Sequence, residues 1–289
     1  MAGRHRVRHR FSELFDFGEG PDGALRAPAS GGPLFRLYGG QVLAQALAAA
    51  QSTVSAEKLA HSCHAYFVRA GRTDQPIDFT VLRDADGRSF SARRIEARQD
   101  GALILTMSAS FHVAEEGASH GAVMPDVPDP ETIVPQDEVI AAALPHMPPH
   151  RTVFWDRDIG IDYRAVEPFV TIDPPRAPAR RAFWFRLRDP MGDDPAEHQR
   201  MLAFASDLYI MHTGLLPLGI SWSAHDLQDA SLDHAIWFHQ AFRADEWLLY
   251  AMDSPYAGGA RTLGRGTIFD RSGRVVASVA QEGLIRIAG

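Results

Sequence analysis

Two histidines and the only cysteine of the chain lie within four residues, at His61, Cys63 and His64. A thiol beside an imidazole is a pairing that serves nucleophilic catalysis. Alternate residues of a β-strand share a face, so His61 and Cys63 are expected on one side and His64 on the other. No acid near this segment is placed to orient the histidine, and its pattern is that of a core strand. We therefore expect a structural strand here rather than a cysteine nucleophile.

No metal centre or cofactor is predicted. Three histidines of the second half, His225, His234 and His239, lack a tight ligand pair with a carboxylate. A single cysteine cannot form an internal disulfide, which favours a reducing compartment, and we expect a cytoplasmic protein.

Composition limits the classes of protein to which the chain can belong. The chain has 289 residues, of which 45% are hydrophobic and 22% charged, as in folded globular proteins. The net charge of −7, with dispersed positive residues, argues against a nucleic-acid partner. No run of 18 apolar residues occurs, so no membrane-spanning helix is predicted. The basic start, Met1 to Arg10, lacks the apolar segment of a secretory signal and is expected to be a frayed tail.

The first half reads as a helix followed by four strands. An Ala-rich helix is predicted over residues 38–51, opened by Gly39 and Gly40. Alternating patterns separated by turns such as Asp100-Gly101 predict an antiparallel sheet. The predicted strands cover residues 61–69, 77–84, 90–99 and 103–113.

A proline-rich stretch, residues 114–150, predicts a linker with one short helix at 137–143. The predicted organisation is an N-terminal unit at 1–113, this linker, and a C-terminal unit at 151–289. The second unit repeats the plan of the first, with a helix from Glu197 to about Gly214 and strands at 234–240, 247–253, 260–269 and 275–286. Three pairs recur in order: His64 with His234 at an offset of 170, Ala92 with Ala260 at 168, and Gly101 with Gly273 at 172. One helix with an antiparallel sheet, given twice, is an α+β fold.

Several blocks resemble the acyl-CoA thioesterase II (TesB-type) family, over nearly the whole length. In the first half these are Tyr38-Gly-Gly-Gln-Val-Leu-Ala-Gln, His61-Ser-Cys-His-Ala-Tyr-Phe and Ser89-Phe-Ser-Ala-Arg-Arg; in the second, Ala205-Ser-Asp-Leu, Ser231-Leu-Asp-His-Ala-Ile-Trp, Glu246-Trp-Leu-Leu-Tyr and Val276-Ala-Ser-Val-Ala-Gln-Glu-Gly. The resemblance implies a double hotdog, two tandem units whose sheets wrap a central helix. It also implies hydrolysis of acyl-CoA to fatty acid and CoA, and a homodimer or homotetramer.

The resemblance places the reaction centre on Asp207, Ser231 and Gln281. The family usually has Thr where Ser231 stands, and Ser keeps the hydroxyl. Thioester hydrolysis needs a water on the carbonyl carbon, a proton acceptor and donors for the developing oxyanion. Asp207 can take the proton, while the hydroxyl and the amide orient the water. These three residues are far apart in sequence, so only the fold can assemble them.

A helix N-terminus presents free N–H groups, so we expect the amides near Gly40 and Gln41 to face the water and bind the oxyanion. The first-half helix carries no Asp or Glu, which predicts one centre per chain, between the halves. The family pattern puts His61 near the pocket. Arginines suit the phosphates of CoA, and Arg93 is our main candidate, with Arg69, Arg72 and Arg94 as others.

Two alternatives stay open. Hotdog enoyl-CoA hydratases pair an Asp with a His five positions later, as Asp207 and His212 are spaced, although the usual Asn-Pro between them is absent and a helix would turn the two side chains apart. A non-catalytic acyl-CoA binding protein is the second alternative, since fold alone does not establish activity.

Overall fold

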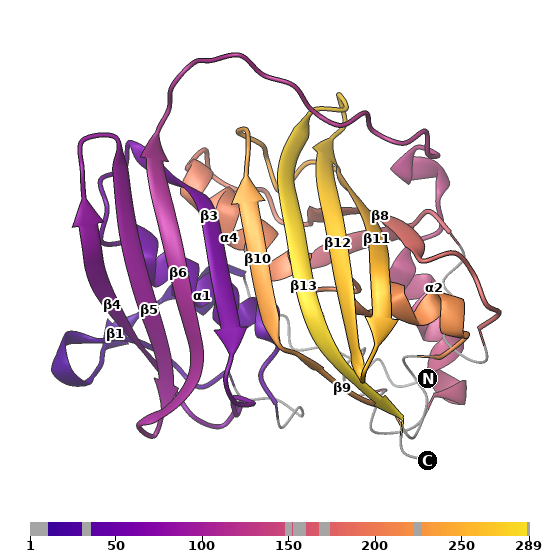
Figure 1. Cartoon of the computed structure of the whole chain (residues 1–289), viewed down its shortest axis with the longest axis horizontal. Helices are drawn as coiled ribbons and strands as arrows, with labels where there is room; N and C mark the ends of the chain where they lie inside the picture. The colour runs from indigo at the N-terminus through magenta and orange to yellow at the C-terminus, as the bar shows by residue number, and fades with distance from the viewer. Residues whose placement is uncertain are drawn as a thin grey trace.

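The computed structural model describes residues 11–30, 36–147, 152, 160–167, 174–221 and 227–287. The described strands form one antiparallel sheet, seen face on in Figure 1. The first half contributes β1 (Gly18–Glu19), β2 (Leu25–Ala27), β3 (Lys58–Phe67), β4 (Ile77–Asp86), β5 (Phe90–Gln99) and β6 (Ala102–Val113). The second half contributes β7 (Ile161–Ala165), β8 (Arg180–Leu187), β9 (Leu227–Ser231), β10 (Asp233–Phe238), β11 (Leu248–Gly258), β12 (Arg261–Asp270) and β13 (Val275–Ile287).

The two halves meet at the centre of this sheet. Its order is β1-β2-β4-β5-β6-β3-β10-β13-β12-β11-β8-β7, with β9 added on β13. Moving outward from the β3–β10 pair, the corresponding strands of the two halves follow in the same order: β6, β5 and β4 on one side, and β13, β12 and β11 on the other. The two halves are therefore related by a local two-fold axis. The repeated plan predicted from the sequence is therefore present. It forms one continuous sheet rather than two separate ones.

The residue-level match of the repeats was wrong in its register. In the β3–β10 pair, His64 lies opposite Ala235 and Ala65 lies opposite His234. His64 is exposed on the outer face, whereas His234 is 1% exposed and faces the helices. Because neighbouring strand residues face opposite sides, an even offset between these strands equates residues of opposite faces. The structural equivalence requires an odd offset.

Three α-helices are described: α1 (Gly39–Gln51), α2 (Gln136–Ala143) and α4 (Pro195–Ser206). Short 3-10 helices cover η1 (Phe11–Phe15), η2 (Pro21–Gly23), η3 (Pro130–Thr132), η4 (Leu144–His146) and η5 (Met211–Leu218). In Figure 1, α1 and α4 lie behind the sheet. They pack antiparallel, since the start of α1 meets the end of α4, while Gln51 at the end of α1 donates to Ala196 O near the start of α4. One apolar cluster with members from both halves surrounds them.

The second core helix ends earlier than predicted. Pro195 opens it and Asp194 caps it by accepting a hydrogen bond from Ala196 N, as such residues do at helix starts. It stops at Ser206, and Tyr209 takes a positive φ of 66° before η5 begins. The segment Pro195–Leu218 is long and apolar enough to cross a membrane by composition, but 72% of its most apolar window is buried in the protein. We read it as a core segment.

The segment after β6 crosses from the first half to the second along one end of the sheet (Figure 1). It packs against the protein, since the indole Nε1 of Trp184 donates to Pro128 O at 2.9 Å and Met124 and Val127 contact a second apolar cluster. The short helix predicted at 137–143 is present as α2. Residues 148–150 of the predicted linker, and the predicted tail from Met1 to Arg10, lie outside the described residues.

The close approach of α1 to α4 gives a stability prediction. A Cβ on Gly40 would collide with Phe204 O and come within 2.7 Å of the Tyr38 ring. We expect Gly40→Ala to lower the free energy of unfolding by about 2 kcal/mol or more, because backbone must move to make room. Gly117 is exposed, with nothing within 4 Å of such a Cβ. Gly117→Ala should change stability by less than about 0.5 kcal/mol. Urea unfolding of both variants checks this, and equal stabilities would contradict it.

Candidate active site

The carboxylate of Asp207 is the centre of a buried cluster of polar groups. Its side chain is 5% exposed. Oδ2 accepts a hydrogen bond from the Gly40 amide at 2.8 Å. Oδ1 accepts from Gln281 Nε2 at 2.6 Å and, at the longer distance of 3.4 Å, from Ser231 Oγ. The structure therefore brings together the three side chains that the sequence indicated, and adds a backbone donor from the other half.

Each group comes from a different element. Asp207 follows the last residue of α4, and Gly40 lies in the first turn of α1. Ser231 ends β9, where it pairs with Gly283 of β13, and Gln281 lies two residues before that glycine. Gln281 faces the core and is fully buried. The pairing of β9 with β13 thus sets the hydroxyl beside the amide, and the packing of α1 on α4 sets the carboxylate.

Helix electrostatics favour this position for the negative charge. The end of α4 disfavours an anion, whereas the start of α1 presents unpaired N–H groups that favour one. Gly39 makes the approach possible, since a Cβ there would come within 2.8 Å of Asp207 Oδ2. The position and the hydrogen bonding of this carboxylate consequently depend on both halves of the chain.

Two tyrosines near this site were not predicted. The Tyr38 hydroxyl donates to Phe204 O at 2.8 Å, and the Tyr250 hydroxyl donates to Ser206 O at 3.0 Å. Both carbonyls belong to the last turn of α4, which leads into Asp207. Burial raises the pKa of both tyrosines well above its ordinary value, and the Asp207 charge adds to this, so both hydroxyls stay protonated donors. The aromatic residues carried no sequence signal that separated them from ordinary core residues.

The predicted oxyanion site is not formed as expected. The Gly40 amide does lie at Asp207, but it donates to the carboxylate itself. The Gln41 amide donates to Tyr38 O at 3.1 Å, within the first turn of the helix. These amides therefore hold the acid and the helix start rather than facing a bound water.

His61 and Cys63 do not share a face, contrary to the prediction. The β3–β6 register shifts between Ala60 and Ser62, which makes His61 the extra residue of a bulge. His61 Nε2 lies 2.8 Å from Ser110 Oγ on the outer face, and its ring packs edge-on against Phe90. This places His61 away from the Asp207 cluster. Cys63 is buried in the core, where burial raises the pKa of its thiol to about 12.

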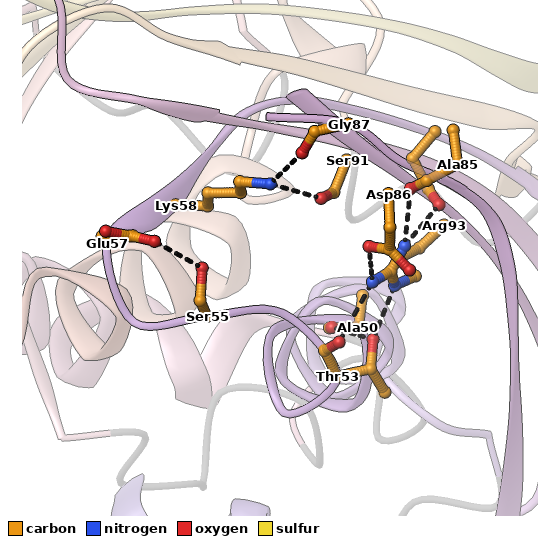
Figure 2. A network of polar contacts seen from close by, with 11 residues as sticks. Ala50, Thr53, Ser55, Glu57, Lys58, Ala85, Asp86, Gly87, Ser91 and Arg93 are labelled. Atoms are coloured by element: carbon orange, nitrogen blue, oxygen red, sulfur yellow. Dashed lines mark hydrogen bonds and ion pairs between the residues drawn. The ribbon is translucent and has the colours of Figure 1, made fainter. Parts of the chain in front are cut away.

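Arg93 is a structural residue in this fold rather than a ligand for CoA. Its side chain is 1% exposed and reaches from β5 to the end of α1 (Figure 2). The guanidinium donates to Thr53 Oγ1, Thr53 O and Ala85 O, and pairs with Asp86 at 2.6 Å. The start of α1 contacts Asp207, whereas Arg93 contacts the other end of that helix. Arg93 therefore does not reach the Asp207 cluster. The other candidates are exposed at the surface: Arg69 donates to Leu103 O, Arg72 pairs with Asp74, and Arg94 pairs with Asp84.

The histidine of the hydratase alternative, His212, has a carboxylate partner other than Asp207. Its Nε2 lies 3.1 Å from Asp229 Oδ2. Among the described residues, no group of three or more His, Cys, Asp or Glu side chains is placed to hold a metal ion.

Comparisons with known proteins agree with this architecture. The family model described as acyl-CoA thioesterase N-terminal domain matches residues 28–112, and the one described as acyl-CoA thioesterase matches residues 171–284. Human acyl-coenzyme A thioesterase 8 is 37% identical over 263 residues, covering 88% of this chain and 82% of the human protein.

Solved structures give the same result. Acyl-CoA thioesterase II TesB2 from Mycobacterium marinum superposes with a TM-score of 0.75 at 36% identity, over 96% of this chain and 97% of that one. A conserved hotdog-fold protein from Alicyclobacillus acidocaldarius superposes with a TM-score of 0.77 at 18% identity, over 98% and 100% of the two chains, which concerns the fold alone. The fold is a double hotdog. The chain belongs to the acyl-CoA thioesterase family of TesB type, whose members are thioester hydrolases.

The contrast between two neighbouring arginines gives a second prediction. We expect Arg93→Met to lower the free energy of unfolding by about 2 kcal/mol or more, because Thr53 and Ala85 O lose a charged donor that is itself buried. Arg94→Met breaks only an exposed ion pair and should cost at most about 1 kcal/mol. Thermal or urea unfolding of the two variants measures the difference. An Arg93 variant as stable as the Arg94 variant would refute the structural role.

Proposed function

We propose that this protein hydrolyses acyl-CoA thioesters to fatty acid and CoA, with a water held by Asp207, Ser231 and Gln281. The observation that carries the proposal is the convergence of a carboxylate, a hydroxyl and an amide on one buried point, 2.6 and 3.4 Å from Asp207 Oδ1. Acyl-CoA as the substrate class follows from membership of the family and from the names of the relatives. Assembly as a homodimer or homotetramer and a cytoplasmic location stay predictions from the sequence.

The reaction can be assigned to these groups step by step. The water oxygen attacks the thioester carbonyl carbon while Asp207 accepts a proton from the water. Ser231 and Gln281 orient the water, so that little orientational freedom is lost during the attack. The tetrahedral intermediate then collapses and the carbon–sulfur bond breaks. The proton held by Asp207 passes to the CoA thiolate, which restores the carboxylate. The Gly40 amide holds Oδ2 throughout, which leaves Oδ1 directed at the water.

Removing the carboxylate tests the proposal directly. We expect Asp207→Asn to lower kcat for thiol release from acyl-CoA by about 2 to 4 orders of magnitude, the usual contribution of a positioned base. Asp253→Asn, which loses only an exposed ion pair with Arg265, is the matched control and should keep full activity. Full activity of the Asp207 variant would move the base elsewhere. Tight acyl-CoA binding without turnover by the native protein would support the binding-protein alternative, and turnover of crotonyl-CoA to a hydroxyacyl-CoA would support the hydratase.

The serine at position 231 provides a separate test. The hydroxyl is the group that the water needs, so Ser231→Ala should lower kcat by about tenfold or more, the scale of one hydrogen bond. Ser231→Thr restores the residue usual in the family and should keep kcat within about tenfold of the native value, since it retains the hydroxyl. Steady-state thiol release over a series of acyl-CoA lengths compares the two. A Thr variant as impaired as the Ala variant would show that the added methyl, rather than the hydroxyl, dominates.

A further inference from the structure

The side-chain amide of Gln281 serves the site in only one of its two orientations. An amide has a donor NH₂ group and an acceptor oxygen, and a half-turn about its last bond exchanges them. With Nε2 towards Asp207 Oδ1, at 2.6 Å, the amide donates to the carboxylate. With the oxygen there instead, two acceptors would oppose each other. A group that binds Oε1 would therefore fix the useful orientation.

His234 is the residue placed to bind that oxygen. β10 and β13 are antiparallel, and Ala235 pairs with Ala280. The residue before Ala235 therefore lies opposite the residue after Ala280, so His234 stands across from Gln281, at the short distance typical of such pairs. Both side chains are buried on the inner face, at 1% and 0% exposed. His234 Nδ1 and Gln281 Oε1 each lack a hydrogen bond of ideal geometry, which makes each the natural partner of the other.

The electrostatic surroundings of His234 indicate that its contact with Gln281 is made to the amide oxygen. Burial lowers the pKa of His234. The charges of Asp207 and Asp233 oppose this lowering, and so does a hydrogen bond with the Gln281 side chain. A hydrogen bond that favours the protonated ring is one with an acceptor, and Oε1 is the acceptor of that side chain. Because Nε2 lies 2.9 Å from Ser206 Oγ, Nδ1 is the nitrogen left for this contact.

The same neighbours determine which nitrogen of the neutral ring carries the proton. Nδ1 lies 3.9 Å from Asp207 Oδ1, too far for a hydrogen bond but near enough for the negative charge to favour an N–H there over a bare lone pair. Nε2 then accepts from the Ser206 hydroxyl at 2.9 Å, which is closer than the other acceptor of that hydroxyl, Ala203 O at 3.1 Å. A proton on Nε2 would instead leave Nδ1 and Oε1 as two acceptors side by side.

We propose that His234 is a positioning residue that holds the Gln281 amide in its working orientation, with Nδ1–H donating to Oε1. This rests on the proposed function, in which Gln281 orients the attacking water. The donors then all run towards the acid: Ser206 Oγ–H to Nε2, Nδ1–H to Oε1, and Gln281 Nε2–H to the Asp207 carboxylate. Hydrogen bonds in such a chain polarise and strengthen one another. Since the chain acts on the geometry of the water, its loss lowers kcat rather than raising KM.

A spectroscopic measurement on the native protein tests the proton position, with His198 as an internal reference of the opposite kind. His198 is also buried, and its Nε2 lies 3.0 Å from Gly192 O, which can only accept, while its Nδ1 accepts from the Ala244 amide at 3.0 Å. The ¹⁵N shifts of histidine rings distinguish the two neutral tautomers. We expect the proton on Nδ1 in His234 and on Nε2 in His198. A proton on Nε2 of His234 at neutral pH would overturn the proposal, whether or not any variant folds.

Two substitutions separate the two ring nitrogens. An Asn side chain can place an amide N–H where Nδ1–H lies, so His234→Asn keeps a donor to Gln281 and loses the contact with Ser206. A Gln side chain reaches the position of Nε2, so His234→Gln does the reverse. We expect His234→Gln to lower kcat for thiol release by about 10- to 100-fold, with KM within about twofold, and His234→Asn to keep kcat within about threefold of native. His198→Gln is the matched control, expected to lower thermal stability and leave kcat unchanged. Native kcat in the Gln variant, or equal losses in the Gln and Asn variants, would contradict the proposal.

A double-mutant cycle tests whether His234 acts through Gln281. Once the amide is removed, the histidine has nothing left to orient, so His234→Gln should lower kcat of the Gln281→Ala variant by less than about twofold. The same fold loss in both backgrounds would show that His234 acts independently and would overturn the proposal. Asp207→Asn in the same assay separates the two hypotheses. Full activity there defeats the proposed function, whereas an inactive Asp207 variant beside a fully active His234→Gln variant defeats this inference alone.

Discussion

The hydrogen bond from the Gly40 amide to Asp207 joins the start of one core helix to the end of the other, and the site depends on it. It places a carboxylate on the positive end of α1, which offsets the unfavourable position of that charge at the end of α4. Two glycines make the contact possible, because a Cβ on either would collide with α4 or with the carboxylate. The tyrosine hydroxyls of residues 38 and 250 satisfy carbonyls in the last turn of α4 and fix the backbone on which Asp207 stands.

Periodicity predicted the elements well and their faces less well. Both core helices and eight strands, β3 to β6 and β10 to β13, were found near their predicted positions, because alternation and turn residues report local structure directly. The short strands β1, β2, β7 and β9 and the strand β8 were missed. The bulge at His61 moved that side chain to the outer face, and the offset of 170 equated His64 with His234 on opposite faces. A one-residue slip leaves a strand pattern intact while reversing every side chain, so the sequence alone does not reveal it.

The residues of the candidate site were likewise predicted only in part. Asp207, Ser231 and Gln281 were indicated by resemblance, and the structure brings them together. Arg93 was misassigned because an arginine in a sequence gives no sign of whether it faces a ligand or the carbonyls at a helix end. From the sequence, His234 was the repeat partner of His64, one of three histidines considered for a metal, and part of a family block, but nothing there placed it beside Asp207. Its place beside the acid follows from the pairing of β10 between β3 and β13, which joins segments more than 200 residues apart in the chain.

The continuous sheet also determines how the molecule can move. Five residue pairs of β3 and β10 join the halves at its centre, α1 packs along α4, and the segment after β6 is packed onto the second half. Rotation of one half against the other would break backbone pairing and open the shared core at once, so the halves behave as one rigid body. A hinge motion between the two halves is therefore not available to expose Asp207, whose side chain is 5% exposed. The contacts of Asp207 with Gly40, Gln281 and Ser231 span both halves, so the packing that joins the halves also holds this cluster together.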